Sequence, residues 1–226
     1  MSDTHISSSV YNFLNKLKKN NNREWFNEHK KEFKQEEQKV KSFYIDLMSK
    51  LRMHDEIDDM KMFRIYRDVR FSANKQPYKE HLSGTFSRVK PRLRGGYYLH
   101  IEPGNTFLAC GFWAPEKDDL KRIRKEFELD AEEIREIINN PNFKKEFGAL
   151  EGEELKTAPR GFDKEHSAID LIKKKQYIVT KNFTDKEAMS PGFIDKVDES
   201  FKTVRPFFDY MSDVLTTDLN GVSTLD

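Results

Sequence analysis

The 226-residue chain is 36% hydrophobic, 12% aromatic and 35% charged, which fits one large domain with a densely ionic surface. No apolar stretch approaches the roughly 20 residues of a membrane-spanning helix, and the N-terminal residues lack the basic patch and apolar run of a secretory signal. A single Cys excludes an internal disulfide and a cysteine-based metal cluster. We therefore expect one cytoplasmic domain over residues 1–226, frayed at residues 1–6 and 216–226, with no cofactor, no metal and no membrane partner.

The charge of the chain is unevenly distributed, although its net value is only +1. Between residues 61 and 100, ten Lys or Arg stand against two acidic residues, a balance of +8 that leaves −7 for the rest of the chain. A positive segment of this kind favours an anionic ligand. We expect a small phosphorylated ligand ahead of nucleic acid, because the negative remainder of the chain repels a long polyanion.

Two helices are expected near the N-terminus. Residues 7–20 carry apolar side chains at the i, i+3, i+4, i+7 spacing of an amphipathic helix. A second, long helix is expected from Asn21 to about Leu51, with Asn21 as its N-cap, Glu24 at the third helical position and apolar residues recurring every seven positions. Both helices are interpreted as scaffold, with a protein-interaction surface as the alternative.

The middle of the chain predicts a sheet. Alternating apolar residues predict a strand over residues 62–71. Four further strands are expected, at residues 82–87, 97–101, 107–113 and 176–179. The pair 97–101 and 107–113 is expected to form a hairpin, because Gly104 and Asn105 between them can adopt the positive φ of a tight turn.

Helices return after the strands. Apolar residues from Ile194 to Leu215 recur at alternating spacings of three and four, which predicts a C-terminal helix kinked at Pro206. Helices, then strands, then helices again are typical of an α+β fold. We expect a single domain with a mostly antiparallel sheet flanked by long N- and C-terminal helices.

The most informative segment covers residues 64–78. On a strand, Arg67 points to the apolar side, whereas the two neighbouring arginines point the other way together with Asp68. Guanidinium groups gathered in this way suit a phosphate or a carboxylate. The alternative is that they pair with the acidic helices, because a buried guanidinium needs a carboxylate or a ligand anion. The candidate ligand-binding residues are Arg64, Arg67, Arg70, Lys75 and Tyr78.

Three residues are candidates for acid–base chemistry: Asp68, His81 and His100. The two histidines flank the basic strands, and an imidazole can take or give a proton near pH 7. Taken alone, each is more typical of a hydrogen-bonding or surface histidine. The second basic run, residues 88–94, is interpreted as a solvated face.

Four more residues are interpreted as structural. Cys110 lies in an apolar run and is expected to be buried and inert, and Tyr97, Tyr98 and Trp113 are expected in the core. The sequence contains no phosphate-binding loop, no His-Glu-x-x-His, no Gly-x-Ser-x-Gly and no Cys-x-x-Cys. Familiar nucleotide hydrolases, zinc peptidases and serine hydrolases therefore lose support.

A family resemblance rests on the same segment. The residues that carry its signature are Arg64, Arg67, Asp68, Arg70, Phe71, Asn74, Lys75 and Tyr78. Residues 21–26, 96–102 and 159–163 also look like that family. Over nearly its whole length the chain resembles the uncharacterised, mostly bacterial domain-of-unknown-function family 2461. The resemblance implies a compact one-domain protein and no established activity.

Three functions remain as alternatives. The first is a binding module for an anionic, phosphate-bearing small ligand, held by the Arg-rich motif. The second is an enzyme acting on a phosphorylated or carboxylated small molecule, with the three acid–base candidates. The third is helix-mediated protein interaction or nucleic-acid binding. The sequence leaves the oligomeric state open.

Overall fold

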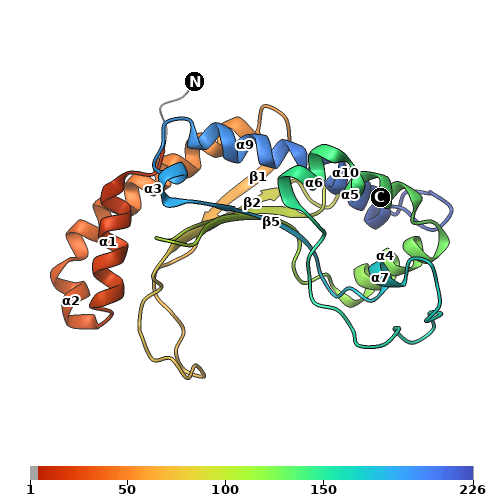
Figure 1. Cartoon of the computed structure of the whole chain (residues 1–226), viewed down its shortest axis with the longest axis horizontal. Helices are drawn as coiled ribbons and strands as arrows, with labels where there is room; N and C mark the ends of the chain where they lie inside the picture. The colour runs from red at the N-terminus through yellow and green to blue at the C-terminus, as the bar shows by residue number, and fades with distance from the viewer. Residues whose placement is uncertain (1–4, 226) are drawn as a thin grey trace. The chain divides into compact units, whose positions relative to one another are not determined.

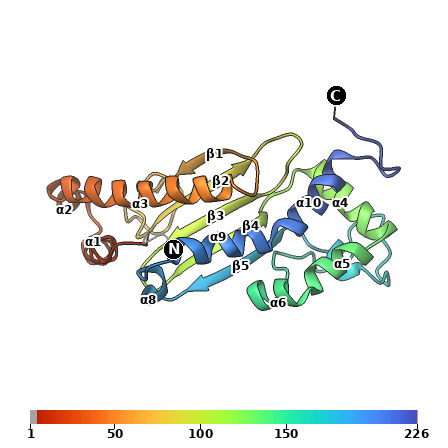
Figure 2. The same ribbon diagram turned by 90° about the horizontal axis from the view of Figure 1, so that it is seen from above.

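Five strands form one antiparallel sheet whose spatial order follows the chain. A computed structural model describes residues 5–225. Its strands are β1 (Ile57–Met62), β2 (Leu82–Arg88), β3 (Gly96–Ile101), β4 (Thr106–Phe112) and β5 (Tyr177–Phe183). Figure 2 shows them side by side, with β1 at one edge and β5 at the other. The predicted α+β fold with its antiparallel sheet is confirmed, as is the hairpin of β3 and β4.

The helices precede and follow the sheet strands. Before the sheet come α1 (Ser8–Lys19), α2 (Arg23–Glu28) and α3 (Lys30–Leu51). Between β4 and β5 come α4 (Lys117–Leu129), α5 (Glu132–Asn139), α6 (Pro141–Phe147) and α7 (Ile169–Ile172). After β5 come α8 (Asp185–Ala188), α9 (Phe193–Thr203) and α10 (Arg205–Thr216). Within residues 5–225, no helix is both long enough and apolar enough to cross a bilayer.

Two compact units can be distinguished. Unit 1 comprises residues 5–86, Tyr98–Leu108 and Asn182–Glu199, and unit 2 comprises Ser87–Tyr97, Ala109–Lys181 and residues 200–225. Strands β2 to β5 each contribute residues to both units. The expectation of one domain over residues 1–226 stays a prediction.

In unit 1, α3 packs on one face of the strands. The Tyr44 hydroxyl donates a hydrogen bond of 2.7 Å to the carbonyl of Leu99, and the Tyr44 ring stacks on Phe86. Glycine is needed at position 84, because a Cβ atom there would lie 2.7 Å from the Tyr44 ring. Figure 1 shows α3 and the start of α9 on this side of the sheet. The helix α3 therefore covers one face of the strands in unit 1 and leaves the opposite face to other parts of this unit.

Unit 2 has an aromatic core. Tyr97 packs against Phe201 and Phe208, and Phe127 meets Tyr177 edge to face. Cys110 is buried, as expected. Trp113 is 70% exposed, so its expected place in the core is wrong. The reason is its position just beyond the end of β4, where the chain leaves the sheet.

The predicted long helix from Asn21 is interrupted. The chain departs from helical geometry at His29, which separates α2 from α3, and the N-cap of α2 is Asn22 rather than Asn21. The Asn22 side chain accepts a hydrogen bond from the backbone N–H of Trp25. Asn21 instead bonds to both the N–H and the carbonyl of Tyr78, so its amide acts as a partner for extended backbone.

The strand predicted over residues 62–71 is also wrong. β1 ends at Met62, and residues 63–81 form an arm that leaves the sheet and returns at β2. Its two sides are joined by the bridge between Tyr66 and Tyr78. Both of these rings pack against Phe26 of α2, so the two tyrosines contact a helix instead of a sheet, whereas Phe71 is 98% exposed. Figure 1 shows the arm on the side of the sheet opposite α3.

The C-terminal segment agrees in part with expectation. The predicted kink at Pro206 is a break, because α9 ends at Thr203 and Pro206 lies in the first turn of α10. Of the ends expected to fray, residues 1–4 and 226 lie outside the described residues. Ile6 is buried and its N–H donates to the carbonyl of Ala188, and the tail folds back through the N–H of Asp218 to the carbonyl of Val222. These residues are hydrogen-bonded rather than frayed.

Candidate functional site

Most polar groups of the Arg-rich motif bind to other residues of the arm. The Arg67 guanidinium donates to the carbonyl of Gln76 at 3.3 Å and to the Ser72 hydroxyl at 3.4 Å. Within residues 5–225 Arg67 has no carboxylate partner, so the alternative of pairing with an acidic helix does not hold for this residue. The guanidinium instead forms hydrogen bonds with groups of the arm itself, so Arg67 stabilises the conformation of the arm.

The neighbouring motif residues follow the same principle. Arg70 forms an ion pair of 2.6 Å with Asp68, and both side chains are exposed. This pairing lowers the pKa of Asp68. The Lys75 ammonium donates to the carbonyl of Val69 at 3.1 Å, and Tyr78 is buried against the helix. These four candidate residues therefore already have partners inside the arm.

Two cations at the base of the arm lack such partners. Lys79 and Arg64 form no ion pair with an acidic residue anywhere in residues 5–225. The Lys79 ammonium lies 5.4 Å from the centre of the Phe63 ring. Its half-buried position lowers its pKa, and the positive charge of Arg64 lowers it further. An anion placed here would relieve both effects.

The second basic run is solvated only in part: Lys90 and Arg92 are exposed, as expected, whereas Arg88 is buried and Arg94 is partly buried. Arg88 is 1% exposed and donates to Asp209 at 2.6 Å, to Ser212 at 3.2 Å and to the carbonyl of Arg94 at 3.0 Å. Arg94 in turn pairs with Asp119. These guanidinium groups tie strand ends to helices of unit 2, and they are not free to bind phosphate.

The two candidate histidines meet on the face of unit 1 opposite α3. Their ring centroids are 4.0 Å apart. His81 immediately precedes β2 and His100 is near the end of β3, and in an antiparallel pair the start of one strand lies beside the end of the other. The third candidate, Asp68, is held by Arg70 in the arm and does not join them.

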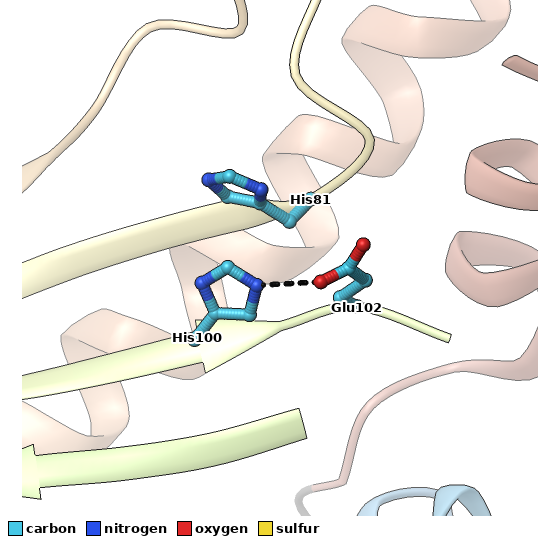
Figure 3. A group of neighbouring side chains, drawn as sticks. All are labelled: His81, His100 and Glu102. Carbon is cyan, nitrogen blue, oxygen red and sulfur yellow. Dashed lines mark hydrogen bonds and ion pairs between the residues drawn. The ribbon is translucent and has the colours of Figure 1, made fainter. Parts of the chain in front are cut away.

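Alternate residues of β3, with the residue directly after it, build the rest of the site. Side chains two positions apart share a face, so Tyr98, His100 and Glu102 form a row. The Tyr98 hydroxyl lies 2.8 Å from His100 Nδ1, and His100 Nε2 lies 3.0 Å from a carboxylate oxygen of Glu102. Phe107 of β4 stacks on the His100 ring at 4.7 Å. Figure 3 shows the His81 ring lying over the His100 ring, and the Glu102 carboxylate directed toward His100.

The protonation states follow from burial and from the neighbouring charges. The pKa of His81 is lowered to about 4, first by burial and then by the adjacent His100. Burial also lowers the pKa of His100, although Glu102 opposes the shift. Burial raises the pKa of Glu102, but hydrogen bonds from Asn105 and His100 outweigh this, and the pKa is lowered. At neutral pH the site therefore holds two neutral imidazoles and one carboxylate.

The sequence missed several members of this site. Tyr98 was expected in the core, Lys79 was counted only as charge, and Glu102 was read as part of the turn. A signal was available, because the predicted strand 97–101 places Tyr98 and His100 on one face, and the same alternation continued by one step includes Glu102. The contribution of His81 required the pairing of β2 with β3.

Comparison with known proteins gives a family and no activity. No curated protein and no solved structure matches the chain. A family model described as a conserved hypothetical protein matches residues 9–210, which is most of the chain. The chain therefore belongs to the family of conserved hypothetical proteins designated DUF2461, the family that its Arg-rich motif had indicated.

Proposed function

We propose that this protein is an enzyme acting on a small molecule that carries a phosphate or a carboxylate. The observation that supports this most strongly is the convergence of His81, His100 and Glu102 beside Lys79, a half-buried cation without an acidic partner in residues 5–225. The site thus combines groups that can exchange protons or donate lone pairs with a group that can hold an anion.

Lys79 is close enough to affect the histidines electrostatically. Its positive charge contributes to the lowered pKa of both His81 and His100. A chain of contacts also links the two, because Lys79 lies over Phe63 and the Phe63 ring meets Tyr98, which bonds to His100. An anionic substrate held by Lys79 and Arg64 would have its neighbouring atoms at the imidazoles.

The alternative of a binding module formed by the whole Arg-rich motif is less well supported. Arg67, Arg70 and Lys75 would each have to give up a partner within the arm before they bound a ligand. Within residues 5–225, Arg64 and Lys79 form no side-chain hydrogen bond or ion pair that a ligand would have to replace. The enzyme hypothesis therefore keeps one residue of the predicted set, Arg64, and adds Lys79.

Anion binding can be tested by NMR with the full chain, using inorganic phosphate and acetate as probes. We expect the ring resonances of His81 and His100 to shift on addition of the anion, and Lys79→Met to weaken binding by about tenfold or more. Lys75→Met is the matched control, because it removes a lysine from the same arm and should leave the affinity unchanged. Shifts confined to other residues, or equal affinities in both variants, would contradict the proposal.

Catalysis needs a separate experiment. A mixture of phosphorylated and carboxylated metabolites is incubated with the wild-type protein and with His100→Asn, and its composition is followed by mass spectrometry. We expect the wild-type protein to consume at least one anionic metabolite that the variant leaves intact. Equal metabolite compositions after incubation with the two proteins would contradict the enzyme hypothesis and favour a binding protein.

A further inference from the structure

We infer that His81, His100 and Glu102 form a binding site for a divalent first-row transition metal ion of the Zn²⁺ class. The inference rests on the proposed function for its location and goes further, because it names the group that would carry the chemistry. One ligand atom from each residue lies within 4.8 Å of the other two (Figure 3).

The distances require only a small adjustment. Zinc bonds to nitrogen and oxygen ligands are about 2.0–2.2 Å long, so two ligand atoms on one tetrahedral ion are about 3.3 Å apart. His100 Nε2 and the nearer Glu102 oxygen already lie 3.0 Å apart. To complete the site, the His81 side chain would have to rotate until a ring nitrogen reaches the ion. Its ring nitrogens have no hydrogen-bond partner to lose within residues 5–225.

The site also has unused lone pairs. The Oε2 atom of Glu102 accepts hydrogen bonds from His100 and from Asn105. Its other oxygen, Oε1, has no hydrogen-bond partner in the part of the chain that the structure describes. This oxygen and the ring nitrogens of His81 are therefore available to bind a metal ion together.

The bond from Tyr98 provides a proton arrangement suited to metal binding. Without metal, His100 donates Nε2–H to the Glu102 carboxylate, and its Nδ1 accepts from the Tyr98 hydroxyl. With metal on Nε2, the single proton of the neutral imidazole sits on Nδ1 and is donated to the Tyr98 oxygen. The proton moves from one ring nitrogen to the other, and none is lost overall. A ligating histidine held through its second nitrogen is the usual arrangement in metal sites.

The donor set indicates the class of metal and its role. Ca²⁺ and Mg²⁺ prefer sites made of oxygen atoms, whereas two imidazoles and a carboxylate suit Zn²⁺ and its neighbours in the first transition row. Three protein ligands leave at least one coordination position open, as in catalytic sites rather than structural ones. A bound ion would activate a water molecule or polarise an oxygen of the substrate there.

The test uses tag-free full-length protein, treated with a chelator and then titrated with ZnSO₄ by calorimetry and with CoCl₂ by visible spectroscopy. We expect one ion per chain and a d–d absorption band for bound Co²⁺. His81→Asn and Glu102→Gln should each lower the affinity by about 100-fold or more. His54→Asn is the matched control, because His54 also lies beside a carboxylate, Asp198, at 2.9 Å but belongs to no group of three possible metal ligands within residues 5–225.

Each outcome decides the question. Binding that His81→Asn and Glu102→Gln abolish and His54→Asn preserves supports the site. Absence of binding to the wild-type protein, or binding that neither ligand variant weakens, overturns it. Circular dichroism of every variant tests whether the protein is still folded. The substitution His81→Gln removes the imidazole in a second way, so that a loss of metal binding is not ascribed to one unfolded variant.

The experiments distinguish a failure of the metal-site inference from a failure of the proposed function. Phosphate binding by chelator-treated protein in the absence of any Zn²⁺ binding would leave the proposed function standing and remove the metal site. Stoichiometric Zn²⁺ binding with no response to phosphate, acetate or metabolites would do the reverse.

Discussion

The hydroxyl oxygen of Tyr98 lies 2.8 Å from Nδ1 of His100, and this bond fixes one side of the imidazole while Glu102 fixes the other at 3.0 Å. Tyr98 stands two residues before His100 on the same strand, and Glu102 stands two residues after it, directly beyond the end of β3. The orientation of His100 is therefore set by β3 and by the first residue of the turn that follows it.

Tyr98 is predicted to act as a positioning residue. Tyr98→Phe removes the acceptor that His100 Nδ1–H needs when its other nitrogen is coordinated, so we expect the affinity for Co²⁺ to fall by about tenfold. The melting temperature should change little, since Tyr98 is only half-buried. Visible titrations of Tyr98→Phe and of Tyr66→Phe, a tyrosine in the arm, make the comparison. Equal Co²⁺ affinities in the two variants would assign Tyr98 no role at the site.

Arg67 is predicted to brace the arm without contributing much to global stability. Its partners are a carbonyl and a hydroxyl, so Arg67→Ala leaves no buried carboxylate unpaired. We expect the free energy of unfolding to fall by about 1 kcal/mol, and amide exchange to become faster for residues 64–78. Urea denaturation and hydrogen exchange measure the two effects. A loss of about 3 kcal/mol or more would instead indicate a buried charge pair.

Arg88 is predicted to be a structural residue and not a nucleic-acid contact. Arg88→Met breaks its bonds to Asp209, Ser212 and the backbone in a buried setting, so we expect a loss of about 2–4 kcal/mol in the free energy of unfolding. Arg92→Met, an exposed member of the same run, should be close to neutral. Urea denaturation compares them. A stable Arg88→Met protein that has lost oligonucleotide binding would favour the nucleic-acid alternative.

The fold around the predicted hairpin could be read from the sequence because its cause is local. Gly104 adopts the positive φ expected of it, at 75°, and the strands on either side are rich in residues that pack well in a sheet. β1 could not be predicted, because only Ile57 of its six residues is buried and an edge strand of this kind has no apolar alternation.

The site was harder to predict than the fold because its causes are not local. His81 and His100 were each recognised as able to exchange protons, but their contact depends on the pairing of two strands. The Arg-rich motif, in contrast, drew attention by its composition. A row of arginines looks the same in sequence whether it binds a ligand or, as Arg67 and Arg88 do, the protein's own backbone and side chains.

The stability at alkaline pH is predicted to depend on Tyr11. This buried residue meets Thr106 at 2.5 Å, and Thr106 bonds to the backbone of Glu102, so Tyr11 supports the turn that carries the carboxylate. Burial raises the pKa of Tyr11 from 10.0 to about 12. The unfolded chain therefore loses this proton first, and the contribution is complete below pH 10 and is lost as the pH rises toward 12.

The measurement compares urea denaturation of the wild-type protein and Tyr11→Phe from about pH 9 to about pH 12. We expect the wild-type protein to lose about 2 kcal/mol more than the variant over this range. Parallel losses in the two proteins would show that Tyr11 ionises equally easily in the folded and unfolded chains.

The most direct measurement is an anomalous-difference map at the zinc absorption edge, from a crystal of the full chain grown with ZnSO₄. We predict one strong peak at bonding distance, about 2.0–2.2 Å, from His81, from His100 Nε2 and from a carboxylate oxygen of Glu102. A map with no peak at these three residues, or with its strongest peak at other side chains, would contradict the assignment of a metal to this site.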